Sequence, residues 1–209
     1  MYATIILGFF CMFSSLITMF KDKNFGLKIA FSFIFLFLAL RFEFGNDYLG
    51  YEDIFYQIQR YGLYDWPNLI GTVEIGWILL CYVFSFFNYQ LLLASIAFFN
   101  SYVCYNFIKK YVHYDYYWLS VFIYIFNPYL MLVHSSAIRQ SLSISLFLMS
   151  INYLYQKKFI KYAIIIIIAT LFHSSAFILI LLPVISLLNK RFSKKTSMAI
   201  ALLFILLFI

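Results

Sequence analysis

Charged residues are scarce in this chain. Only 11% of its 209 residues are charged, whereas 65% are apolar and the mean hydropathy is +0.92. A soluble domain of this length has too little interior to bury so much apolar surface, so the composition excludes an ordinary soluble globular protein. The 27 phenylalanines and 19 tyrosines suit lipid-facing packing and the aromatic belts found at membrane interfaces.

Cysteine and histidine are also few. Cys11, Cys81 and Cys104 form no Cys-x-x-Cys pair, and each lies in apolar sequence, which excludes a disulfide framework or a cysteine metal site. The three histidines lack the spacing of metal ligands. The chain has no glycine-rich phosphate loop and no nucleophile elbow, so we predict no metal and no cofactor.

The net charge of +7 does not form one continuous basic face. Most of the basic residues fall in short clusters between apolar runs: Lys21/Lys23/Lys28, Lys109/Lys110, Lys157/Lys158/Lys161 and Lys190/Arg191/Lys194/Lys195. Such clusters mark loops and anchor helix ends in membrane proteins. We therefore expect the lipid bilayer as a partner and no nucleic acid.

Eight apolar segments approach the roughly 20 residues that a transmembrane helix needs. They are residues 2–20, 27–40, 75–87, 90–108, 116–133, 138–155, 162–188 and 196–209. We predict an all-α, polytopic membrane protein with about seven to eight transmembrane helices in one domain over residues 1–209. The last segment is still apolar at its end, so we expect the N-terminal part of a longer fold.

Two features affect the number of spans. Asn127-Pro128 should bend or end the fifth helix, because proline removes a backbone donor and restricts the residue before it. The short segment 75–87 leaves a re-entrant loop open as an alternative to a span, and that alternative would change the topology after it. We place the polar stretch 41–72 on the outer side of the membrane, because the basic segment 21–28 before it is the clearer cytoplasmic signal.

That polar stretch contains an amphipathic pattern. In residues 48–61, Tyr51, Ile54, Phe55 and Ile58 follow the i, i+3, i+4, i+7 spacing of one helical face. We predict a helix here that lies in the membrane interface.

A turn precedes this helix. Arg41 ends the second apolar segment, and Gly45-Asn46 can turn the chain so that Asp47 returns close to Arg41. The alternative is an ordinary interfacial arginine followed by a turn aspartate.

Three ionisable residues lie within or beside later apolar segments. Glu74 begins the third helix, where the helix dipole alone would account for an acid. Arg139, followed by Gln140, begins the sixth helix, where its charge needs water, a partner acid or an anionic ligand. An arginine fork suits a diphosphate. His173 lies midway along residues 162–188 and is either an acid–base group or a core histidine bonded to a neighbouring helix.

In their order and their placement between hydrophobic helices, several short motifs resemble the EpsG-type family of exopolysaccharide polymerases, which is related in kind to the Wzy O-antigen polymerases. The motifs are Arg41…Gly45-Asn46-Asp47-Tyr48…Tyr51, Glu74-Ile75-Gly76, Ile138-Arg139-Gln140, Lys157-Lys158-Phe159-Ile160-Lys161-Tyr162 and Phe172-His173-Ser174-Ser175-Ala176. The resemblance covers residues 1–188. Full members are longer, and many have proline where this chain has Ile75.

The resemblance implies a multi-pass enzyme of the bacterial cytoplasmic membrane. Such an enzyme joins undecaprenyl-diphosphate-linked oligosaccharide repeat units into exopolysaccharide, capsule or O-antigen, alongside other membrane proteins of polysaccharide assembly. Two functions stay open beside it, a flippase or transporter of lipid-linked sugars and a membrane acyltransferase that uses His173 as its base. An inactive or structural membrane subunit is a further alternative.

The same resemblance implies roles for eight residues. Arg139 and Arg41, with Gln140, would bind the diphosphate. His173, or alternatively Asp47 or Glu74, would orient or deprotonate the acceptor hydroxyl. Tyr48 and Tyr51 would stack on sugar faces.

Overall fold

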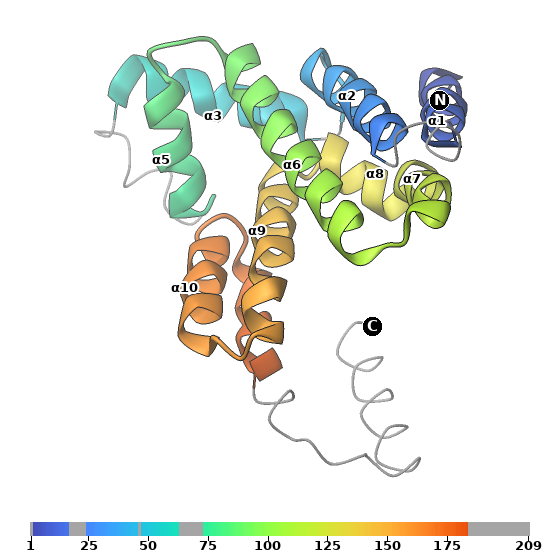
Figure 1. Cartoon of the computed structure of the whole chain (residues 1–209). Helices are drawn as coiled ribbons and strands as arrows, with labels where there is room; N and C mark the ends of the chain where they lie inside the picture. The colour runs from blue at the N-terminus through green and yellow to red at the C-terminus, as the bar shows by residue number, and fades with distance from the viewer. Residues whose placement is uncertain (1, 17–23, 46, 63–72, 184–209) are drawn as a thin grey trace.

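The computed structural model describes residues 2–16, 24–45, 47–62 and 73–183, and their regular structure is helical (Figure 1). In chain order the elements are α1 (Tyr2–Leu16), α2 (Phe25–Ala39), α3 (Tyr48–Tyr61), α5 (Ile75–Phe84), α6 (Tyr89–Tyr111), the 3₁₀ helix η3 (Tyr114–Tyr116), α7 (Tyr117–Phe126), α8 (Pro128–Ser135), α9 (Ile138–Tyr155), α10 (Phe159–Thr170) and the 3₁₀ helix η4 (Ser174–Leu181). The predicted all-α class is therefore confirmed.

The long helix α6 crosses the middle of the molecule and contributes to two apolar cores (Figure 1). In the first core, α1 packs against α2 and α7, and α2 packs against α6. Leu27, Ile34 and Val121 are fully buried there. In the second core, α3 and α5 pack against α6 and α9 around Phe55 and Trp77. The N-terminal ends of α5 and α9 meet α3 beside the second core, where Arg139 contacts Glu74 and Tyr51.

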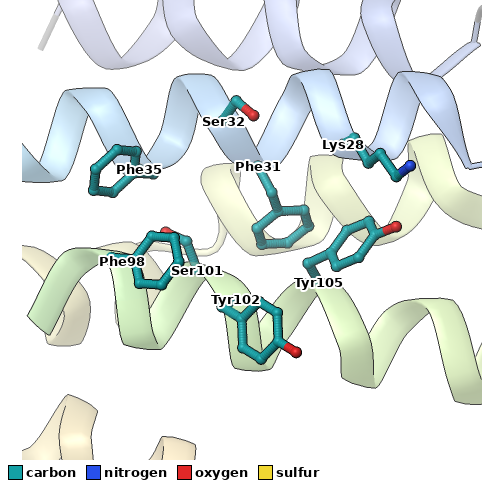
Figure 2. Close-up of a pocket in the computed structure, with 8 residues that line it drawn as sticks. All are labelled: Lys28, Phe31, Ser32, Phe35, Phe98, Ser101, Tyr102 and Tyr105. Carbon is teal, nitrogen blue, oxygen red and sulfur yellow. The ribbon is translucent and has the colours of Figure 1, made fainter. Parts of the chain in front are cut away.

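Aromatic side chains line a groove of about 250 Å³ between α2 and α6. Figure 2 shows Phe31 and Phe35 of α2 facing Phe98, Tyr102 and Tyr105 of α6, with Lys28 at one end. The rings meet edge to face, with 5.8 Å between the centroids of Phe35 and Phe98. This apolar, aromatic surface is typical of a lipid-facing helix pair.

The amphipathic helix predicted over residues 48–61 is confirmed as α3, Tyr48–Tyr61. Its buried face holds Tyr48, Tyr51, Phe55 and Ile58. Gly62 follows with a φ of 61°, a left-handed conformation that glycine adopts without steric cost and that ends the helix. The helix thus turns one tyrosine-rich face inward.

Among the described residues, α6 is long and apolar enough to cross a membrane by itself. The pair α7 and α8 meets the same criterion together, and it bends by 70° at Asn127-Pro128, the break that the sequence predicts. The Asn127 side chain accepts hydrogen bonds from Tyr129 N and Leu130 N, which satisfies the start of α8. Helices α1, α2, α5 and α10 are apolar but shorter. The total of seven to eight spans stays a prediction, and residues 196–209, the eighth segment, lie outside the described residues.

The prediction of one helix over residues 162–188 is wrong. Helix α10 ends at Thr170, a turn follows, and η4 begins at Ser174 and packs beside α10. At 12 residues, α10 is about 18 Å long, too short for a bilayer core of about 30 Å. His173 therefore lies in the turn, with extended backbone angles, and not in the middle of a helix.

Both local sequence and tertiary contacts explain this break. Five consecutive isoleucines precede it, and β-branched residues lower helix propensity, while the serines after His173 favour helix starts over helix interiors. The start of α5 then supplies partners for two backbone groups of the turn. Gly76 N donates to Leu171 O at 2.7 Å, and Ser174 N donates to the Glu74 carboxylate at 3.2 Å.

The contact between α1 and α2 depends on Gly26. A Cβ atom built there would collide with the backbone carbonyl oxygen of Ser14, whereas a Cβ atom built on Gly50 in α3 would meet nothing within 4 Å. We expect Gly26→Ala to lower the thermal unfolding midpoint in detergent by about 3 to 10 °C, the effect of an overpacked contact in a chain of this size. Gly50→Ala is the matched control and should leave the midpoint unchanged or raise it. Equal midpoints for the two variants would contradict the close packing of α1 on α2.

Candidate active site

Four segments that are distant in the sequence meet at one cluster of polar side chains. Its members are Tyr51 from α3, Glu74 from the residue before α5, Arg139 from the first turn of α9 and His173 from the turn between α10 and η4. The side chains of Glu74, Arg139 and His173 are 21%, 22% and 31% exposed. The charges are therefore sheltered but still open to a ligand.

Glu74 is the centre of this cluster. Its Oε2 forms an ion pair with Arg139 Nη1, and its Oε1 accepts a hydrogen bond from Ser174 N at 3.2 Å. The same Oε1 lies 3.6 Å from His173 Nδ1. Although Glu74 precedes α5, its side chain makes no capping bond to that helix. It instead satisfies the first backbone donor of η4, so capping of its own helix does not account for this acid.

Glycine at position 76 allows Glu74 to reach the turn. A Cβ atom on Gly76 would lie 2.5 Å from Leu171 O and 2.8 Å from the Leu171 carbonyl carbon. Only glycine lets the first turn of α5 approach this carbonyl closely enough for the hydrogen bond from Gly76 N. The Glu74-Ile75-Gly76 motif thus combines the acid with the residue that positions it.

Arg139 is held by Tyr51 as well as by Glu74. Its Nε donates to the Tyr51 hydroxyl at 3.2 Å, and its guanidinium carbon lies 5.3 Å from the centre of the Tyr51 ring. Tyr51 packs in turn against Trp77, with 5.0 Å between ring centroids. Burial raises the pKa of Tyr51 above its usual value, so its hydroxyl keeps its proton at neutral pH. That hydroxyl can therefore donate to Asp47 Oδ2, 3.5 Å away, while it accepts from Arg139.

Arg41 lies outside this cluster. It is buried, and its Nη1 donates to His134 O at 2.9 Å and to Ser135 O at 3.0 Å, the last carbonyls of α8. A cation is favoured at this end of a helix. Within the described ranges, no ion pair joins Arg41 to Asp47; the expected turn includes Asn46, which lies outside them.

Gly45 packs against the same end of α8 as Arg41. Its φ is 107°, and a Cβ atom there would lie 2.8 Å from Ser135 O. Arg41 and Gly45 therefore tie the segment before α3 to the C-terminus of α8.

Tyr48 and Gln140 lie beside the cluster. Tyr48 is buried, with its ring 5.4 Å from that of Tyr89, so it packs α3 onto α6. Gln140 lines a cleft of about 640 Å³ between α9 and η4, which His173 also lines. The cluster thus opens onto this cleft through His173.

A family model matches residues 24–209, a range that includes every residue of the cluster. It describes the EpsG family. The chain belongs to the EpsG family. No curated protein and no solved structure matches it. Membership of the EpsG family implies a role in polysaccharide biosynthesis, and a membrane location is consistent with α6 and the other apolar helices.

Sequence reasoning selected all four residues of the cluster in this EpsG-family chain but missed how they connect. Nothing in the sequence paired Arg139 with Glu74, 65 residues earlier, or placed Tyr51 under the guanidinium. It also missed Asn100, whose amide bonds to Ser141 and Ser145 across the packed helices α6 and α9. An asparagine within an apolar run of α6 was the available signal.

The ion pair should show energetic coupling. Glu74→Gln or Arg139→Gln alone leaves a partly buried charge without its partner, so each should lower the thermal midpoint. The double variant removes both charges and keeps the shapes, so its loss should be smaller than the sum of the single losses, by about 1 kcal/mol or more. The measurement is thermal unfolding of all four proteins in one detergent. Additive losses would contradict the contact.

Proposed function

We propose that this protein is a polysaccharide polymerase that joins lipid-linked oligosaccharide repeat units at the Arg139–Glu74–His173 cluster. One observation carries the proposal: a cation, a carboxylate and a histidine from three distant segments converge at a partly exposed point beside a large cleft. Transfer from a lipid diphosphate needs a group for the leaving anion and a group for the acceptor proton.

Arg139 is suited to bind the diphosphate. Tyr51 holds its Nε and Glu74 holds its Nη1, and among the described residues Nη2 has no hydrogen-bond partner. Charge-assisted hydrogen bonds from a fixed guanidinium are strong donors to phosphate oxygens. An incoming diphosphate bonds to Nη2 and competes with Glu74 for Nη1.

His173 is suited to take the proton of the acceptor. A carboxylate beside Nδ1 favours the tautomer with its proton on that nitrogen, which leaves Nε2 as the base. In the proposed step, an acceptor hydroxyl oxygen attacks the anomeric carbon of the donor sugar. The bond from that carbon to the diphosphate oxygen breaks, and the hydroxyl proton moves to His173 Nε2. Undecaprenyl diphosphate leaves with the bonding electrons.

The other candidate residues take supporting roles in this proposal. Both oxygens of Glu74 are engaged, so it orients Arg139 and His173 and does not act as the base. Asp47, which is exposed, accepts from Tyr51 and steadies the ring beneath Arg139. Arg41 and Tyr48 hold the start of α3 in place and, being buried, do not reach the diphosphate or the sugar.

The proposal includes a multi-pass protein of the bacterial cytoplasmic membrane. In this proposal α6 and the bent α7–α8 pair are spans. The packed hairpin of α10 and η4, whose turn lies at the cluster, is assigned as a re-entrant pair. Non-helical backbone is tolerated at membrane depth where protein surrounds it, and Gly76 and Glu74 bond to this turn. Other membrane proteins of polysaccharide assembly supply the repeat units.

Arg139→Lys tests the diphosphate site. Lysine keeps the charge but loses the planar fork and the bond to Tyr51, so polymer formation should fall on the order of 10²-fold with normal membrane insertion. The assay is glycan length on a gel, in a strain whose own gene is deleted. Arg60→Lys, at an exposed position on α3, is the matched control and should support normal polymer. Normal polymer from Arg139→Lys would contradict this role.

His173→Ala tests the proposed base. Loss of a general base should reduce polymer formation by about 10²- to 10⁴-fold without reducing the amount of protein in the membrane. His113→Ala is the matched control, since the His113 side chain is 60% exposed. The position of stalled repeat units is informative: single units on the outer leaflet support polymerisation, whereas units on the inner leaflet would identify a flippase. Full-length polymer without acyl groups would identify an acyltransferase.

A further inference from the structure

The cleft between α9 and η4 has two walls that change from polar to apolar in the same direction. On α9, Gln140, Ser143, Ile144 and Phe147 line it, at the i, i+3, i+4, i+7 spacing of one helical face. The first two are polar and the last two apolar, over about 10 Å of helix. The lining of the cleft therefore changes from polar to apolar along the length of the cleft.

The wall formed by η4 shows the same order. It begins with His173, Ser174 and Ser175 and continues with Phe177, Ile178 and other apolar residues. The polar ends of the two walls coincide, because Glu74 binds both Arg139, next to Gln140, and Ser174. Arg139 does not itself line the cleft, but it adjoins Gln140 and shares Glu74 with Ser174, so its positive charge lies beside the polar end.

We propose that this cleft holds the polyprenyl chain of the lipid-linked donor, with its diphosphate at Arg139 and its first isoprene units along Phe147 and Phe177. This assignment rests on the proposed function and adds the place of the carrier lipid. An anionic head followed by an apolar chain matches the order of charge, polar groups and apolar groups in the cleft. The volume of about 640 Å³ is within the range of small-molecule sites.

The placement separates the two substrates. The carrier lipid enters between α9 and η4, so the acceptor sugar approaches from the side of α3, where Tyr51 and Asp47 lie. His173 is accessible from both the lipid cleft and the α3 side, since it lines the cleft and faces Glu74. It therefore lies where the acceptor hydroxyl meets the donor.

Photocrosslinking tests the position of the lipid. The photoreactive residue p-benzoylphenylalanine replaces Phe177 in the cleft or, as the control, Phe98 in the aromatic groove between α2 and α6. The two side chains are matched in type and exposure, at 63% and 59%. The protein is reconstituted in phospholipid nanodiscs with radiolabelled undecaprenyl diphosphate as the probe.

We expect label at position 177 that excess unlabelled undecaprenyl diphosphate removes and that Arg139→Gln abolishes, with none at position 98. Equal label at both positions, or label at 177 that Arg139→Gln leaves unchanged, would overturn the assignment. If label is absent while Arg139→Lys still blocks polymer, the lipid site is wrong and the polymerase proposal stands. If the label appears as expected but Arg139→Lys forms normal polymer, the lipid site stands and the polymerase proposal fails.

Discussion

The arrangement of the candidate site depends on the carboxylate of Glu74. Its two oxygens bond to the side chain of α9 residue Arg139 and to the first backbone donor of η4, and one of them faces His173. These contacts join parts of the chain that are 65 and 100 residues apart in sequence. An arginine at the start of an apolar helix is costly unless it has a partner, so Glu74 both stabilises the charge and fixes its position.

The Glu74 carboxylate reaches its partners because the start of α5 packs closely against the turn after α10. Gly76 lets α5 approach the carbonyl of Leu171. Because α10 ends at Thr170, backbone groups of the turn after it can bond to α5 and Glu74 instead of to a continuing helix. The Tyr51 hydroxyl accepts a hydrogen bond from Arg139 Nε, and its ring packs against both the guanidinium and Trp77. Each neighbour is thus fixed by packing or by a hydrogen bond, as preorganised binding of a diphosphate requires.

Apolar runs, together with the amphipathic pattern of residues 48–61, were enough to locate most helices in advance. The bounds of α3 and α9 were predicted to the residue, and the break at Asn127-Pro128 followed from the chemistry of proline. The break at His173 was not predicted, because residues 162–188 read as one long apolar run. What interrupts that run is tertiary: Gly76 and Glu74 give the turn its hydrogen bonds, and a sequence window cannot contain them.

The site residues were selected by type, and their grouping was only partly predictable. Arg139, His173 and Arg41 were all selected because ionisable groups are rare in apolar segments. Arg139 and His173 lie in the cluster, whereas Arg41 binds the end of α8. A sequence shows that a buried charge needs a partner but not which partner it has.

The most direct test of this account is the glycan made by the double variant Glu74→Gln, Arg139→Gln in a strain whose own gene is deleted. This variant keeps the shapes of both side chains and lacks both charges, so it separates a structural pair from a functional one. The account predicts protein in the membrane at near-normal amount and loss of long glycan. Long glycan of normal length from this variant would show that the pair only holds the helices together, and it would contradict a site for the diphosphate at Arg139.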